Sequence, residues 1–174
     1  MRNPSRSTFR ALALAAVLAA GAAFADATWE VETLVPELIS IRVPSTTIAF
    51  GLDAVSYPPD AFPASYPALE PEDGVLPVQV FSNAEGTWSL LLAVPDLVDG
   101  VTGARIPADQ VLFRVDDGLW LRASAAPQIA YTGVGPTEGW RELRVAFALE
   151  LQGSELNGAY RVDALISAIH EPAP

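Results

Sequence analysis

The 174-residue chain contains no cysteine, no lysine, one histidine and one methionine. Without cysteine it has no disulfide and no thiolate nucleophile, and without lysine it has no amine for Schiff-base chemistry. The single imidazole, His170, lies in a tail that ends in prolines, where it is poorly placed to act as a catalytic base. The side chains most often used for covalent catalysis are therefore missing or isolated.

Positive charge is also scarce, because ten arginines stand against 21 acids and give a net charge of −11. Arg2, Arg6 and Arg10 lie before residue 26 in a stretch without acids, which leaves seven arginines against 21 acids, or −14, in the remainder. So acidic a surface repels nucleic-acid phosphates and anionic lipid headgroups. We expect no nucleic-acid partner and no peripheral binding to membranes.

The first 25 residues have the pattern of an export signal. Their arginines precede an apolar run at 11–20, and Ala23 and Ala25 form an A-x-A cleavage pattern, with cleavage after Ala27 as the alternative. The apolar part is shorter than the roughly 20 residues that a membrane span needs. We interpret residues 1–25 as a signal peptide. Residues 26–174 are then a single domain, secreted to the periplasm or cell surface, with no membrane span.

Beyond residue 26, apolar residues recur with a period of two rather than 3.6. The clearest strand covers 140–151, whose apolar face carries Leu143, Val145, Phe147, Leu149 and Leu151. Further strands are predicted at 29–34, 38–43, 46–52, 78–82, 88–94, 111–115, 119–123 and 160–169. Asp117-Gly118 predicts a hairpin turn with positive φ between two of them, and 108–110 predicts one helical turn. About eight or nine strands predict an all-β fold, either an antiparallel β-sandwich or a sheet closed on itself.

Residues 53–77 carry six prolines, which cannot donate to a strand ladder, so we expect a surface loop or a pleat along a sheet edge. The aromatic residues Tyr57, Phe62 and Tyr66 allow two interpretations. They contact a partner or a sugar, or they fold back and pin the loop to the domain. Of the four tryptophans, at least two are expected in the core and Trp120 at the surface, where it is a candidate for stacking on carbohydrate.

No motif for hydrolase, zinc, redox or nucleotide chemistry is present. The carboxylates of Glu142 and Glu150 fall on the polar face of their strand, which is unsuitable for a catalytic pair. Acids in turns, such as Asp96, Asp99 and those at 70–73, offer oxygen ligands but lack the spacing of a calcium loop. We therefore predict no catalytic residue, no cofactor, no metal and no enzymatic activity.

Three short motifs resemble secreted bacterial β-sandwich surface proteins. They are the extended stretch 43–51, the Trp-x-Leu at Trp88 to Leu90, which is similar to WxL cell-wall domains, and Gly158-Ala159-Tyr160. The last resembles the start of the final strand in immunoglobulin-like and pilin-like sandwiches, and the resemblance implies a tyrosine-corner hydrogen bond for Tyr160. The second Trp-x-Leu of WxL proteins is replaced by Phe147-Ala148-Leu149, so peptidoglycan binding is not implied. The resemblance implies an immunoglobulin-like fold and an extracytoplasmic location.

Two functions follow as hypotheses. The first is a non-enzymatic structural protein of the cell envelope, which associates with itself or with another envelope protein and forms filaments by strand donation. Residues 26–35 are the candidate donor, because Trp29, Val31 and Thr33 alternate with polar residues; pairing of this segment within its own domain is the alternative. The second is a module that binds carbohydrate or protein through Tyr57, Phe62, Tyr66 and Trp120.

Overall fold

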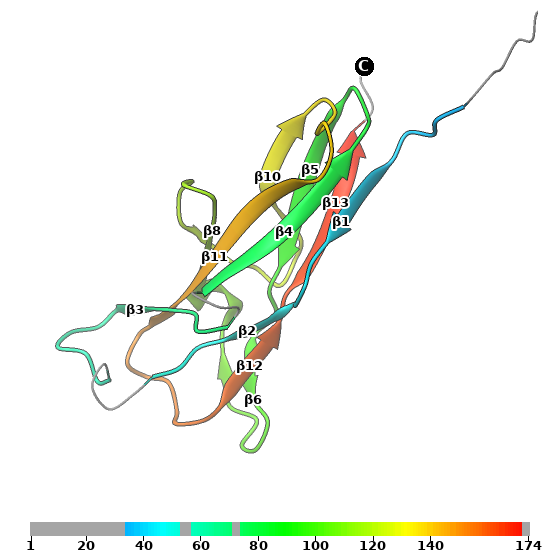
Figure 1. Cartoon of the computed structure of the whole chain (residues 1–174). Coiled ribbons are helices and arrows are strands. Elements are labelled where there is room, and N and C mark those ends of the chain that lie inside the picture. The colour runs from blue at the N-terminus through cyan, green and yellow to red at the C-terminus, as the bar shows by residue number, and fades with distance from the viewer. Residues whose placement is uncertain (1–33, 53–56, 71–73, 172–174) are drawn as a thin grey trace, which may run out of the picture. The chain divides into compact units, whose positions relative to one another are not determined.

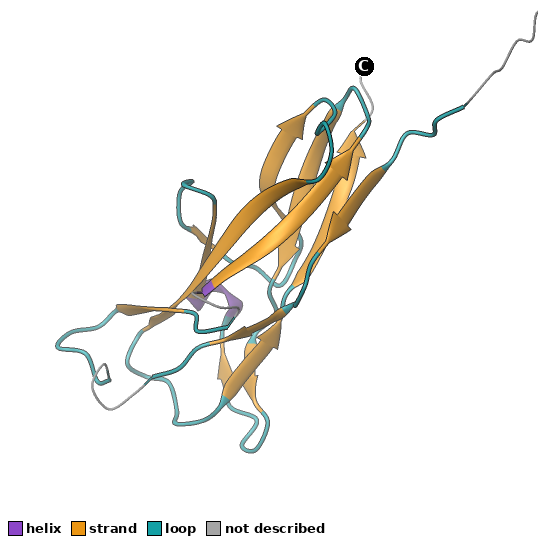
Figure 2. Cartoon of the chain, in the orientation of Figure 1, coloured by secondary structure: helices purple, strands orange, loops and turns teal. Residues whose placement is uncertain are grey.

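The computed structural model describes residues 34–52, 57–70 and 74–171, which form β-strands, turns and short 3₁₀ segments, without an α-helix (Figures 1 and 2). The predicted all-β class is therefore confirmed. The elements are β1 (Ile39–Arg42), β2 (Thr47–Ala49), β3 (Ala64–Pro67), β4 (Val75–Ser82), β5 (Thr87–Ala93), β6 (Leu97–Asp99), β7 (Arg105–Ile106), η2 (Ala108–Gln110), β8 (Val111–Val115), β9 (Leu121–Arg122), β10 (Gln128–Val134), β11 (Arg141–Leu151), β12 (Tyr160–Asp163) and β13 (Leu165–Glu171).

The chain divides into two compact units, Met1–Val35 and Pro36–Pro174. The expected signal peptide and the expected donor residues Trp29, Val31 and Thr33 lie outside the described residues. All of the strands named above belong to the second unit. Within the described ranges, no helix has the length and apolar character needed to span a membrane.

The largest sheet has the order β1-β4-β11-β8-β9, and β3 also pairs with β11. Every pairing in it is antiparallel. β11 is the longest strand, and its apolar residues alternate along its whole length, although Ala148 on the other side is also buried. All five of its predicted inward residues are at most 3% exposed: Leu143, Val145, Phe147, Leu149 and Leu151.

Two smaller antiparallel sheets complete the unit. One has the order β10-β5-β13 and the other β2-β12-β6-β7. Apolar residues from all three sheets form one buried cluster, in which Trp88, Phe113 and Phe147 are the largest fully buried side chains. Burial of each such side chain stabilises the fold by about 1.5–3 kcal/mol.

Trp88 on β5 lies against the backbone of β10. Gly133 is its register partner, and a Cβ atom at Gly133 would overlap the indole ring. The indole Nε1–H donates a 3.2 Å hydrogen bond to the carbonyl oxygen of Gly135, and its ring centroid is 5.6 Å from that of Tyr131. A glycine on β10 thus makes room for the largest side chain of the core.

The proline-rich segment differs from the sequence expectation. β3 pairs with the C-terminal half of β11, and β4 begins at Val75, so Pro77 lies inside a strand. Pro77 is the register partner of Arg144 on β11. On its other side the ladder with β1 begins only at Gln79, so proline, which lacks an N–H, breaks no hydrogen bond with β1. Of the two alternatives for 53–77, the surface loop is therefore wrong for 64–67 and 75–77, whereas β3, which pairs only with β11 among the described strands, fits a pleat along a sheet edge.

One turn and one strand also differ in part from expectation. The hairpin β8–β9 forms with its turn at 116–118 as predicted, and Gly118 N–H closes the turn on Val115 O at 2.9 Å, but the positive φ lies at Asp116 (50°) and not at Gly118. The strand expected at 160–169 is split at Ala164, where the chain passes from the sheet of β2 to that of β5. The predicted helical turn at 108–110 is present as η2.

Candidate functional site

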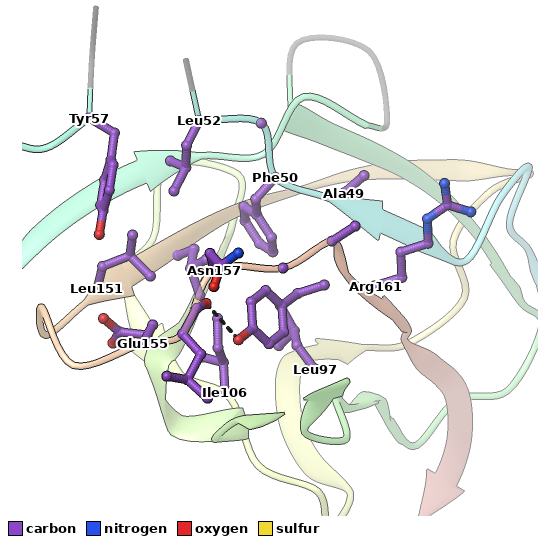
Figure 3. Close-up of a pocket in the computed structure, with 16 residues that line it drawn as sticks. Ala49, Phe50, Leu52, Tyr57, Leu97, Ile106, Leu151, Glu155, Asn157 and Arg161 are labelled. Atoms are coloured by element: carbon purple, nitrogen blue, oxygen red, sulfur yellow. Dashed lines mark hydrogen bonds between the residues drawn. The ribbon is translucent and has the colours of Figure 1, made fainter. Parts of the chain in front are cut away.

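A pocket of about 490 Å³ opens beside the C-terminal end of β11 (Figure 3). Its inner wall is aliphatic, with Leu97 and Ile106 from β6 and β7, and Leu149 and Leu151 from β11. Its outer wall comes from the segment after β2 and from the loop before β12. The complete lining is Ala49, Phe50, Gly51, Leu52, Tyr57, Leu97, Ile106, Leu149, Leu151, Glu155, Leu156, Asn157, Gly158, Ala159, Tyr160 and Arg161.

The loop before β12 is fixed from one side by the carboxylate of Asp99. One oxygen accepts hydrogen bonds from Val101 N–H (3.2 Å), Thr102 N–H (2.6 Å) and the Thr102 hydroxyl (2.6 Å), and the other accepts from Ala159 N–H (2.8 Å). These hydrogen bonds, the Thr102 hydroxyl first, lower the pKa of Asp99 from its ordinary 3.8 to about 2. Asp99 is therefore ionised, and it joins the turn after β6 to the loop that lines the pocket.

Glu155 fixes the other end of the same loop. Its Oε1 accepts from Gln110 Nε2 (2.7 Å) and Gln152 N–H (2.8 Å), and its Oε2 accepts from Gly153 N–H (2.8 Å). Burial alone would raise the pKa of Glu155, but these hydrogen bonds outweigh burial and lower it. Gln110 also donates to Glu150 O at 3.1 Å, so the loop is held against η2 and β11.

Tyr160 forms part of the pocket wall. Its hydroxyl donates a 2.8 Å hydrogen bond to the carbonyl oxygen of Leu156, four residues upstream, which is the kind of contact that a tyrosine corner makes (Figure 3). Burial, followed by the nearby Asp99 and Glu155 carboxylates, raises the pKa of Tyr160. The two carboxylates therefore place this side of the pocket in a negative potential.

Tyr57 lies at the mouth of the pocket and is held there by Phe62. The two rings meet edge to face with centroids 6.5 Å apart. Phe62 rests on Gly153, where a Cβ atom would lie 2.8 Å from Phe62 Cδ2 and where φ is +91°. The rings remain 37% and 40% exposed. These two predicted contact residues thus meet each other at the pocket, and only Tyr57 lines it.

The other predicted contact residues lie elsewhere. Tyr66 is buried in the core, as the pinning interpretation expects. Trp120 is 44% exposed, but the guanidinium carbon of Arg114 lies 5.0 Å from its ring centroid. Trp140 is covered in the same way, because the guanidinium carbon of Arg42 lies 3.8 Å from its ring centroid. The structure therefore does not bring Tyr57, Tyr66 and Trp120 together into one binding face.

The sheet β10-β5-β13 presents a second notable surface. Its inner face carries Trp88, Leu90 and Leu92, so the alternate residues point outward. Four apolar residues there are 41–80% exposed: Ile129, Val134, Leu165 and Ile169. Except for Glu171 at the end of β13, the three strands contain no acid and no arginine. We call this surface the uncharged face.

Metal-ligand chemistry finds little support in the described ranges. Among residues 34–52, 57–70 and 74–171, no three His, Cys, Asp or Glu side chains gather closely enough to hold an ion. Of the acids at 70–73, Glu72 and Asp73 lie outside these ranges. The carboxylate oxygens of Asp99 accept hydrogen bonds from the protein itself. His170 lies on β13 with its Nδ1 4.0 Å from a Glu37 oxygen.

Sequence reasoning missed the pocket, although part of the signal was available. Asp99-Gly100-Val101-Thr102 is a pattern in which a carboxylate accepts hydrogen bonds from the backbone two and three residues ahead. It predicts a fixed turn, but not the long-range bond to Ala159. The other available sign of the pocket was Leu156, an apolar residue in a polar loop.

Two comparisons with known proteins identified no relative of this chain. The chain matches no model of a known protein family, and no curated protein matches it.

Proposed function

We propose that the protein is a non-enzymatic structural component of the cell envelope, exported by the signal sequence at 1–25 and folded as an immunoglobulin-like β-sandwich. Support for the sandwich comes from the core, because the inward residues of β4, β11 and β8 share one cluster with those of β5 and β13. Support for export comes from the arginine-rich start, the apolar run and the A-x-A pattern.

The observation that carries the proposal is the uncharged face. Copies of a chain with a net charge of −11 repel each other over most of their surface. On the sheet β10-β5-β13, apolar side chains are exposed with a single acid in the three strands, Glu171 at the end of β13. Exposed apolar patches of this kind mark interaction surfaces. We therefore assign association to this sheet.

The form of association that we propose is strand donation. Both outer strands of the sheet pair only with β5 within the described part of the chain. β10 has a register shift between Ile129 and Tyr131, which interrupts a regular ladder, whereas β13 pairs with β5 over seven consecutive residues. The edge of β13 in one copy would accept residues 26–35 of the next.

Apolar and acidic residues alternate in the donor segment, and this alternation allows strand donation to be tested. Trp29→Ser with Val31→Ser removes the apolar side of the segment, and Glu30→Ser with Glu32→Ser is the matched control on its other side. We expect light scattering after size exclusion to show oligomers for the parent and the control, and monomers for the apolar pair. Assembly that is unchanged in the apolar pair and after deletion of 26–35 would rule out donation.

A second candidate is the module that binds carbohydrate or protein, which the partial exposure of Tyr57 and Trp120 favours. Its test is a glycan array with Tyr57→Ala and Trp120→Ala. Binding that is lost in either variant supports this function. A blank array for a folded parent protein argues against carbohydrate as the ligand.

A further inference from the structure

The pocket beside β11 has features that neither proposed function uses. Its volume of about 490 Å³ lies within the range of small-molecule sites, roughly 300–1,000 Å³. Its inner wall belongs to the buried core, because Leu97, Ile106, Leu149 and Leu151 are each at most 3% exposed. The hydrophobic core of the domain is thus continuous with an open cavity.

The outer wall is preformed rather than loose. Asp99 and Glu155 hold the loop before β12 with hydrogen bonds of 2.6–3.2 Å to backbone and side-chain donors. The hydroxyl of Tyr160 closes the same loop through Leu156 O. Ligand binding would therefore cost little ordering of the loop, which favours affinity.

Two polar side chains of the wall, Glu155 and Tyr160, are already engaged with the protein, which leaves those of Asn157 and Arg161. Both oxygens of Glu155 and the hydroxyl proton of Tyr160 make internal hydrogen bonds. Few groups remain to pair with the hydroxyls of a sugar, and an unpaired buried hydroxyl costs about 1–3 kcal/mol. Apolar side chains dominate what the cavity offers, and three of them stand partly exposed at its mouth: Leu52, Tyr57 and Leu156.

Charge narrows the ligand class further. The Asp99 and Glu155 carboxylates, which contribute to the raised pKa of Tyr160, disfavour an anion at this wall. Arg161 is the one cationic residue of the lining, and Figure 3 shows its guanidinium directed away from the aliphatic wall. The aromatic rings of Phe50, Tyr57 and Tyr160 suit a flat molecule.

We propose that this pocket binds a small, uncharged, largely apolar molecule that contains one or two rings. The inference goes beyond both functions above, because it requires neither assembly nor carbohydrate recognition. All of the residues that line the pocket belong to the second unit.

The test uses the neutral fluorophore N-phenyl-1-naphthylamine, titrated into the purified protein. We expect saturable binding to one site, and weaker binding of the anionic 1-anilinonaphthalene-8-sulfonate. Leu156→Ser removes an apolar side chain from the mouth but keeps the carbonyl that Tyr160 uses, so the dissociation constant should rise about fivefold to tenfold. Leu119→Ser is the matched control, because Leu119 is 84% exposed in the β8–β9 turn, and it should leave binding unchanged.

A second variant, Leu52→Ser, removes another partly exposed apolar side chain from the mouth and should also weaken binding; circular dichroism checks that it folds. The absence of saturable binding in the parent protein, or equal binding in Leu156→Ser and Leu119→Ser, would overturn the proposal. The oligomeric state is measured on the same samples by light scattering. A loss of ligand binding at the pocket and a loss of self-association are therefore observed separately.

Discussion

Replacement of Gly133 by alanine tests how the core is built around Trp88. The added Cβ atom overlaps the indole ring, which is 1% exposed and has no free space to enter. Overpacking of this kind costs about 1–3 kcal/mol, and displacement of the ring also weakens the Nε1–H bond to Gly135 O by about 1 kcal/mol. Alanine loses less backbone entropy on folding than glycine does, which offsets about 0.5–1 kcal/mol of this loss of stability. We expect a net loss of about 2 kcal/mol.

Urea unfolding followed by tryptophan fluorescence measures this loss. Gly100→Ala is the matched control, because a Cβ atom there meets nothing within 4 Å, and its stability should stay within about 0.5 kcal/mol of the parent. Trp88→Phe should cost less in the Gly133→Ala background than in the parent, since the smaller ring relieves the overlap. Equal urea midpoints for Gly133→Ala and Gly100→Ala would refute the packing of Trp88 against β10.

Three further predictions concern the core and the pocket loops. Asp99 has a folded pKa of about 2 against an ordinary 3.8, so its contribution to stability is present above about pH 4 and is lost as the pH falls toward 2. Asp99→Asn should therefore lower the melting temperature at pH 5 and flatten its decline between pH 5 and pH 2 in calorimetry. Tyr160→Phe removes the hydrogen bond to Leu156 O and should cost about 1 kcal/mol in urea unfolding, and no change would show that the bond is absent in solution. Phe147→Ala empties a fully buried position and should cost about 3–5 kcal/mol, whereas a loss below 1 kcal/mol would contradict its place in the core.

The parts of the fold that were predictable are those in which one physical cause dominates. In β11, alternation identifies the inward side, and the five predicted inward residues are buried; Ala148, on the other side, is buried too because β11 pairs there with both β3 and β8. β10 was not predicted, because a register shift after Ile129 breaks its alternation and Gly133 lacks a side chain. β3 was not predicted because Pro63 precedes it and Pro67 is its last residue, although prolines are tolerated at the margin of a sheet.

The split between β12 and β13 shows a different limit. Val162 and Ala164 are buried and Ile166 is half-buried, so the alternation continues through the point where the chain changes sheets. A periodic pattern reports which side of a strand is buried but not which strand lies beside it. The pocket was hidden for the same reason, because its walls come from residues near 50, 100 and 155 that only the tertiary fold brings together.

Sedimentation velocity over a range of protein concentrations tests the central proposal, association through the sheet β10-β5-β13, most directly. Leu165→Glu places an acid on the uncharged face, at a residue that is 61% exposed and contributes nothing to the core. The account predicts that the sedimentation coefficient of the parent protein rises with concentration and that the variant stays monomeric. A parent protein that sediments as a monomer at every concentration, or a variant that associates equally well, would contradict it.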